Sequence, residues 1–234
     1  MEKLNKDELF TLALHLDLPS LLNFCSSNKN IERNICKRDD IWIYKLKKDF
    51  PDYKNLKVEN KSFRELYKIL YLLSQIKIKL KRKETIYDLY ELKELDLSYN
   101  KLREIPKEIG ALSNLQKLYL YNNKLTKVPK EIGALSNLQR LYLYNNQLAE
   151  IPKEIGDLAN LELLYLPYNK LTKIPKEIGA LSNLQELNLS NNLLTEIPKE
   201  IGDLYNLKEL SLSNNQLTKI PKEITENENI KIYK

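Results

Sequence analysis

The side chains that could perform catalysis are few and far apart in this 234-residue sequence. His15 is the only histidine, and Leu14 and Leu16 beside it indicate a packed helix position rather than a catalytic one. One histidine and two distant cysteines, Cys25 and Cys36, do not match a zinc site. We find no glycine-rich phosphate loop and no pairing of a nucleophile with a base. We therefore expect no enzyme activity, no metal and no cofactor.

Tyrosines in the middle of the chain favour binding instead. They fall in groups whose members are 23 residues apart, and tyrosine and arginine are enriched at binding hot spots. The predicted substrate-binding residues are Lys117, Tyr119, Tyr121, Arg140, Tyr142, Tyr144, Leu163, Tyr165 and Tyr168. The two cations among them suggest a partner with acidic or phosphorylated groups. Duplication is the alternative explanation, because two of the groups are almost identical and tyrosine favours strands.

A 23-residue unit, written six times, positions these tyrosines. Each copy contains L-x-x-L-x-L-x-x before an asparagine and, with few changes, x-L-x-x-I-P-x-x-I-G-x-L-x-N after it. These asparagines are Asn100, Asn123, Asn146, Asn169, Asn192 and Asn215. The pattern resembles the leucine-rich repeat family, and its I-P-x-x-I-G form is similar to the Ras-group repeats. The resemblance implies an α/β fold, a short horseshoe-shaped solenoid with parallel strands on the concave face.

The physics of one repeat agrees with that fold. Alternate leucines of a short strand point to one side, and no repeat can bury them without a stacked neighbour. We expect the repeated asparagines to bond backbone groups and form a ladder along the solenoid. Proline should open a short helical turn, where its missing N–H costs nothing. Gly110 and its equivalents should end that turn with a positive φ.

Composition limits the other function classes. The net charge is +6, and residues 1–88 hold the whole excess, concentrated at residues 77–83. Such a cluster could bind nucleic acid or an acidic membrane, but we favour a solvated helix end, where cations suit the dipole. The chain has no 18-residue apolar run, and its first ten residues do not resemble a signal peptide. We expect Cys25 and Cys36 to be buried free thiols in an intracellular, cytoplasmic protein.

The N-terminal segment resembles an F-box. The correspondence is E-L-F-x-L-A-x-x-L-D-L-P-S-L-L-N-F-C from Glu8 to Cys25, S-N-K after it, and D-I-W-x-x-K-L-x-x-D-F-P from Asp40 to Pro51. Asn5-Lys6 replaces the leucine-proline pair with which the family usually opens. Together with SFRELYKILYLLS, the segment looks like F-box-like proteins of large DNA viruses of protists. The resemblance implies these adaptor-binding residues: Glu8, Leu9, Leu12, Leu16, Leu18, Pro19, Leu21, Leu22 and Trp42.

These observations predict three parts. Residues 1–51 form a small all-α F-box-like domain, with helices that Asp7 and Ser20 could cap. Residues 52–88 hold a polar linker and a helix capped by Ser62, which should seal the first repeat. Residues 89–234 form the leucine-rich repeat domain of six repeats and a truncated seventh.

The resemblances together imply a two-part adaptor. The F-box-like segment would bind a Skp-type adaptor and through it a cullin–RING ubiquitin ligase, while the repeats present a protein substrate. Because the segment resembles viral F-box-like proteins, we expect the protein to act in an infected host cell. The alternative is a Ras-group scaffold that binds a small GTPase or a phosphatase, with its N-terminal helices serving only as a cap. We expect neither nucleic acid nor a membrane as a partner.

Overall fold

The computed structural model describes residues 5–56 and 61–234. The chain divides into two compact units, Met1–Tyr87 and Asp88–Lys234, which we call the helical unit and the repeat unit. Within the described residues, no helix combines the length and the hydropathy that crossing a bilayer requires.

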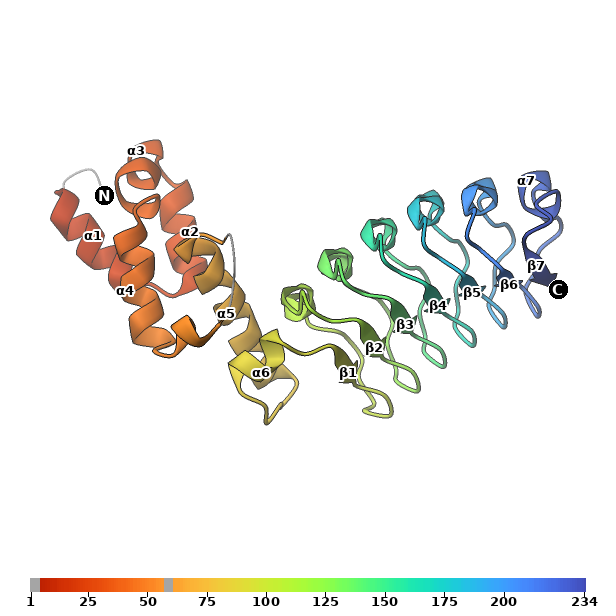
Figure 1. Cartoon of the computed structure of the whole chain (residues 1–234), viewed down its shortest axis with the longest axis horizontal. Helices are drawn as coiled ribbons and strands as arrows, with labels where there is room; N and C mark the ends of the chain where they lie inside the picture. Colours follow the sequence, from red (N-terminus) through yellow and green to blue (C-terminus); the bar gives the residue numbers. More distant parts are fainter. Residues whose placement is uncertain (1–4, 57–60) are drawn as a thin grey trace. The chain divides into compact units, whose positions relative to one another are not determined.

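Short helices build the helical unit (Figure 1). They are α1 (Lys6–His15), α2 (Leu18–Ser26), α3 (Lys29–Ile31), the π-helical turn η1 (Glu32–Cys36), α4 (Asp39–Asp49), the 3₁₀ turn η2 (Tyr53–Asn55) and α5 (Phe63–Lys79). A further helix, α6 (Ile86–Tyr90), crosses the boundary between the units. Helix α4 packs against both α1 and α5, so α5 is part of this helical core.

Capping side chains decide where the helices begin. Asn5 starts α1 through a capping box, in which it accepts from the Glu8 N–H while the Glu8 carboxylate accepts from the Asn5 N–H. The expected cap at Asp7 is therefore wrong by two residues, and the unusual Asn5-Lys6 opening has a structural role. Asp17 caps α2 by accepting from the Ser20 N–H, so Ser20 is the donor and not the cap. Ser62 caps α5 as predicted.

Trp42 lies at the centre of the helical unit. It is 1% exposed, its ring centroid is 5.8 Å from that of Tyr67, and its indole N–H donates to the Cys36 carbonyl over 2.8 Å. Buried Lys45 donates from Nζ to the Leu16 carbonyl over 2.6 Å, at the end of α1. Burial lowers the pKa of this lysine. The charge stabilises carbonyls that a helix end leaves without an intrahelical partner.

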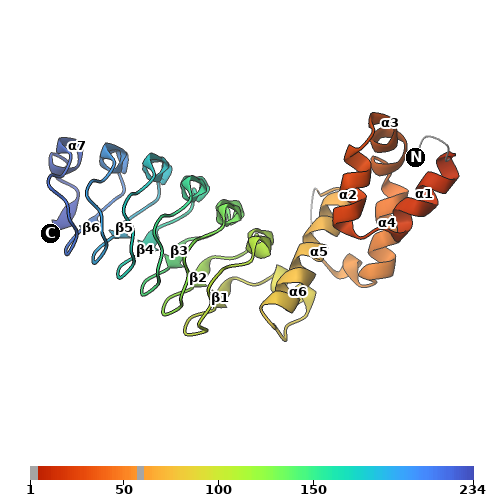
Figure 2. The ribbon, with the colours of Figure 1, turned by 180° about the vertical axis from the view of Figure 1, so that it is seen from behind.

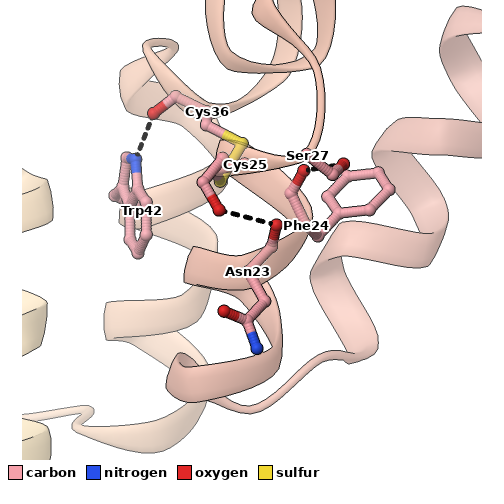
Figure 3. Close-up of a disulfide and its surroundings, with 7 residues drawn as sticks. Asn23, Phe24, Cys25, Ser27, Cys36 and Trp42 are labelled. Atoms are coloured by element: carbon pink, nitrogen blue, oxygen red, sulfur yellow. Dashed lines mark hydrogen bonds between the residues drawn. A yellow bond between two sulfur atoms is a disulfide. The ribbon is translucent and has the colours of Figure 1, made fainter.

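The two cysteines form a disulfide that ties α2 to η1 (Figure 3). Cys25 and Cys36 lie 5.8 Å apart at Cα and are both buried. The expectation of two free thiols is therefore wrong. The sequence separation of 11 did not reveal the pair, because only the turn through α3 and η1 brings the two Cβ atoms together.

The repeat unit consists of stacked coils, each with one strand and one helical turn. In residues 88–234 the parallel strands are β1 (Glu94–Asp96), β2 (Lys117–Tyr119), β3 (Arg140–Tyr142), β4 (Leu163–Tyr165), β5 (Glu186–Asn188), β6 (Glu209–Ser211) and β7 (Lys231–Tyr233). The turns are η3 (Lys107–Ala111), η4 (Lys130–Ala134), η5 (Lys153–Asp157), η6 (Lys176–Ala180), η7 (Lys199–Asp203) and α7 (Lys222–Thr225). Strands form one row and turns another (Figures 1 and 2). The predicted α/β solenoid is confirmed, with 3₁₀ turns in the five coils from η3 to η7.

Leucines and asparagines hold the coils in register. The central strand leucines, such as Leu118 and Leu141, pair with one another and are fully buried. The predicted asparagine ladder is present. Asn146 donates to the Leu120 carbonyl of the preceding coil over 2.9 Å and accepts from the Leu125 N–H over 3.0 Å. A second ladder, whose role we did not predict, runs through the asparagines that follow the turns, as Asn137 donates to the Ser113 carbonyl.

The repeated glycines are required by close packing and not by an unusual φ. None of them has a positive φ, so that expectation is wrong. A Cβ at Gly110 would lie 2.6 Å from the Glu131 carbonyl oxygen of the next coil. Thr225 stands at the same position of α7. The glycine thus sets how closely neighbouring turns approach.

Candidate binding surface

The outward-facing strand residues form one surface, which we call the strand face. In each coil the third, fifth and seventh residues of L-x-x-L-x-L-x-x flank buried leucines, and the strand pairing aligns them in rows. One row runs from Glu94 through Lys117, Arg140 and Leu163 to Glu186. The rings of Tyr119, Tyr142 and Tyr165 follow each other in the next row.

The tyrosines of the middle coils touch one another, as predicted. Tyr119 and Tyr142 stack with centroids 4.9 Å apart and planes 8° from parallel. Tyr121 and Tyr144 stack at 4.5 Å and 5°. Tyr119 and Tyr121 are nearly perpendicular, with an interplanar angle of 86°. The rings therefore present both faces and edges to whatever lies on them.

These rings line a hollow of about 560 Å³, which we call the tyrosine hollow. Its lining residues are Tyr119, Tyr121, Tyr142, Tyr144, Asn145, Tyr165, Pro167 and Tyr168. The lining is mostly aromatic, with hydroxyl and amide groups as its polar part, which is the composition expected of a recognition site.

Burial raises the pKa of three of the tyrosine hydroxyls, and neighbouring carboxylates add to the shift at two of them. Burial and the Glu94 carboxylate raise the pKa of Tyr119. Burial and Glu186 raise the pKa of Tyr165, whose hydroxyl donates to the Glu186 carboxylate over 3.3 Å. Burial likewise raises the pKa of Tyr144. The hollow therefore offers neutral hydrogen-bond donors at physiological pH.

The two outer tyrosines occupy strained backbone positions. The eighth residue of the motif has a positive φ in every copy, and four copies carry asparagine there, which tolerates it. Tyr99 and Tyr168 instead carry a bulky ring at φ of 57° and 56°. Both side chains are well exposed, at 71% and 58%. Duplication of the asparagine-bearing copies does not produce these two tyrosines, so the strain indicates a functional reason for them.

The predicted substrate residues form one area, but not all of them line the hollow. The six tyrosines of that prediction line it, whereas Lys117, Arg140 and Leu163 lie in the neighbouring row. Lys117 forms an ion pair with Glu94, with 3.1 Å between Nζ and Oε2. The site prediction omitted Asn145 and Pro167, whose position in the strand motif was the signal that could have included them.

The predicted adaptor-binding residues divide by burial. Leu18, Leu21 and Trp42 are at most 4% exposed and belong to the core of the helical unit. The others are exposed or half-buried: Glu8, Leu9, Leu12, Leu16, Pro19 and Leu22. Leu12 is 39% exposed on α1. In this conformation, an adaptor could contact the second group directly and the first only by displacing the core.

No group of three or more histidine, cysteine, aspartate or glutamate side chains in residues 5–56 and 61–234 is arranged to hold a metal ion. The chemistry that the strand face supports is noncovalent recognition, through aromatic surface, hydroxyl donors and charges.

Comparison with known proteins identifies the repeats. A family model described as a leucine-rich repeat region matches residues 50–187, which is more than half of the chain. A second model, leucine rich repeat, matches residues 159–217 and 182–229. No curated protein is significantly similar to the chain.

Solved structures agree. A leucine-rich repeat protein of Leptospira interrogans is 49% identical with a TM-score of 0.59, over 64% of this chain and 39% of its own. A TDR receptor is 34% identical with a TM-score of 0.52, over 55% of this chain and 23% of its own. This chain therefore spans well under half the length of either protein. With the family match, the ladder and the stacked coils, we conclude that the chain belongs to the leucine-rich repeat family.

Proposed function

We propose that the chain is a non-catalytic adaptor whose strand face captures a protein. The tyrosine hollow carries this proposal, because it is a contiguous aromatic surface and one of its members, Tyr168, has a strained backbone. Leucine-rich repeat proteins are generally interaction scaffolds.

The second half of the proposal concerns the helical unit. We propose that it docks onto a Skp-type adaptor and so joins a cullin–RING ubiquitin ligase in an infected host cell. The F-box-like sequence pattern from Glu8 to Pro51 supports this, and so does the exposed apolar side chain of Leu12. The ligase would then transfer ubiquitin to the captured protein through its other subunits.

The test of the substrate half uses the tagged full-length chain. Tyr142→Ala combined with Tyr165→Ala should weaken capture of a co-purified protein by about 2 kcal/mol or more, because both rings line the hollow. Ser211→Ala with Ser213→Ala, on half-buried positions outside the hollow, is the control. Equal recovery with both pairs, measured by quantitative mass spectrometry, would place the site elsewhere.

The test of the adaptor half changes a surface residue and spares the core. Leu12→Asp should abolish recovery of a Skp-type subunit, because an exposed leucine becomes a charge without disturbing folding. Tyr44→Asp, on an equally exposed position of α4, should not. If Leu12→Asp has no effect while the tyrosine pair does, the scaffold that binds a GTPase or phosphatase becomes the better account.

We propose an intracellular location as part of this function. The disulfide bears on it, because thiols in reducing compartments are mostly kept reduced. A Cys25–Cys36 disulfide that persists in the living cell would therefore contradict an intracellular location. Alkylation of thiols during denaturing lysis tests this, because unfolding exposes cysteines that are buried in the folded chain. Protection of both cysteines under these conditions would place the protein in an oxidising compartment.

A further inference from the structure

The charges around the tyrosine hollow specify its occupant more closely than the tyrosines do. Acidic side chains lie at both ends of the hollow: Glu94 and Asp96 on β1, and Glu186 and Glu209 on β5 and β6. At the first end Glu94 forms an ion pair with Lys117, and Asp96 on the same strand leaves this end with a net negative charge. Arg140 remains as a cation in the middle. The ends of the surface therefore favour a partner with positive charges. This differs from the acidic partner that Lys117 and Arg140 suggested in the sequence.

The spacing of the rings fits a particular backbone conformation. Neighbouring strands lie about 4.8 Å apart, so Tyr119 and Tyr165, two strands apart in one row, are separated by about 9.6 Å. One turn of a polyproline II helix has three residues and rises about 9.3 Å. In a polyproline II segment that runs across the strands, residues one turn apart can therefore contact Tyr119 and Tyr165 in the same way.

The chemistry of the lining fits this conformation as well. A polyproline II backbone makes no internal hydrogen bonds, so its carbonyls need donors. The hydroxyls of Tyr121, Tyr142 and Tyr144, which line the hollow, supply such donors. Aromatic grooves elsewhere bind proline-rich segments in this way, using the flat rings for the prolines and hydroxyl groups for the carbonyls.

We propose that the tyrosine hollow binds an extended proline-rich segment that carries a basic residue at each end. Glu94 and Glu186 occupy one row four strands apart, about 19 Å at the spacing above. Six residues of polyproline II also span about 19 Å. The two basic residues are therefore six positions apart, and Arg140, midway between the two glutamates in their row, donates to the segment's carbonyls. The inference rests on the proposed function, since it names the kind of segment that the captured protein offers.

The experiment uses labelled peptides and the full chain. The probe is an arginine, five prolines and a second arginine. One control peptide has glutamate at both ends, and another keeps the arginines around a glycine-serine centre. Fluorescence anisotropy should show the probe binding at least about tenfold more tightly than either control, with affinity falling as salt rises. Equal affinities, or tighter binding of the glutamate peptide, would overturn the inference.

Protein variants locate the binding. Glu186→Lys should lower the affinity for the arginine probe by at least about tenfold and raise it for the glutamate peptide. Glu162→Lys, one residue before β4 and outside the aligned row that contains Glu186, is the matched control and should change neither. Equal effects of the two variants would show that net charge alone governs binding.

The outcomes also separate this inference from the proposed function. If the tyrosine pair is needed for protein capture but no peptide binds, the hollow is a capture site for another kind of segment and the inference falls. If the probe binds in the hollow while capture does not depend on the tyrosines, the proposed function falls.

Discussion

Tyr99 and Tyr168 show at the residue scale how stability and function oppose each other in one repeat. Four other copies have asparagine at this left-handed position, where its side chain can bond the neighbouring coil, as Asn145 donates to Asn122 over 2.8 Å. A tyrosine there gains no such bond and carries strain of about 1 kcal/mol. Tyr168 nevertheless lines the hollow.

Tyr168→Asn should therefore stabilise the repeat unit and weaken binding together. We expect about 0.5–1 kcal/mol of added stability, from relief of the left-handed strain. Thermal unfolding, followed by circular dichroism, measures the change in stability. Titration against the captured protein measures the change in affinity. Asn145→Tyr should do the opposite to stability. A loss of stability in Tyr168→Asn would show that its ring contributes to folding.

At the scale of the element, the coil is held by a polar ladder and by close turns. Asn146 makes three buried hydrogen bonds, to the Leu120 and Leu143 carbonyls and from the Leu125 N–H. Asn100, in the first coil, is exposed and donates to the Ser98 carbonyl. The same residue type thus stands in two environments.

Asn146→Ala should cost about 1–3 kcal/mol, because it leaves the Leu125 N–H buried without a partner, whereas the Leu120 and Leu143 carbonyls still accept from Asn123 and Asn169. Asn100→Ala should cost less than about 1 kcal/mol, since water can replace its bond. Urea denaturation of the two variants gives the comparison. Similar losses would mean that the ladder contributes evenly along the solenoid, independent of burial.

Gly133 tests the spacing of the turns. A Cβ there would lie 2.5 Å from the Glu154 carbonyl oxygen and 3.0 Å from the Glu154 Cβ. Gly133→Ala should therefore destabilise by about 1–3 kcal/mol. Its φ is not positive, so alanine without a clash would instead stabilise by about 0.4–1 kcal/mol. A lower unfolding free energy of Gly133→Ala would support the clash, and a higher one would contradict it. Thr225→Ala in α7 is the control, and its unfolding free energy should change by no more than about 0.5 kcal/mol.

At the scale of the whole molecule, two units use different means of stabilisation. The repeat unit repeats one coil, whereas the helical unit closes a small core around Trp42 and adds a disulfide beside it. Trp42 is the only tryptophan, and it bonds to the Cys36 carbonyl. Its fluorescence therefore reports on this unit.

Cys25→Ala with Cys36→Ala should lower the stability of the helical unit by about 2–3 kcal/mol, as expected for opening a loop of this length. The urea midpoint of Trp42 fluorescence measures the change. Dithiothreitol should lower the parent's midpoint and leave the variant's unchanged. Thiol titration of the denatured, unreduced parent should find none of its two cysteines free; two free thiols would contradict the disulfide.

The amino-acid sequence by itself determined the solenoid, because every coil repeats the same local physics. Leu118 and Leu141 had to face inward, and the asparagine had to serve backbone groups, wherever copies stack. The tyrosine area followed from the same periodicity. Strand register alone was therefore sufficient to predict which tyrosine rings lie together.

Only the tertiary structure decided what depends on residues distant in sequence or on the exact approach of two coils. The Cys25–Cys36 bond required the fold of the intervening turns. The role of Gly110 depended on where the next coil's carbonyl lies, and not on its own φ. Whether Leu21 and Trp42 are surface or core depended on how the helices pack. Local pattern specifies the coil, because its interactions recur at one period, whereas burial, pairing and clashes are set by which atoms the chain brings together.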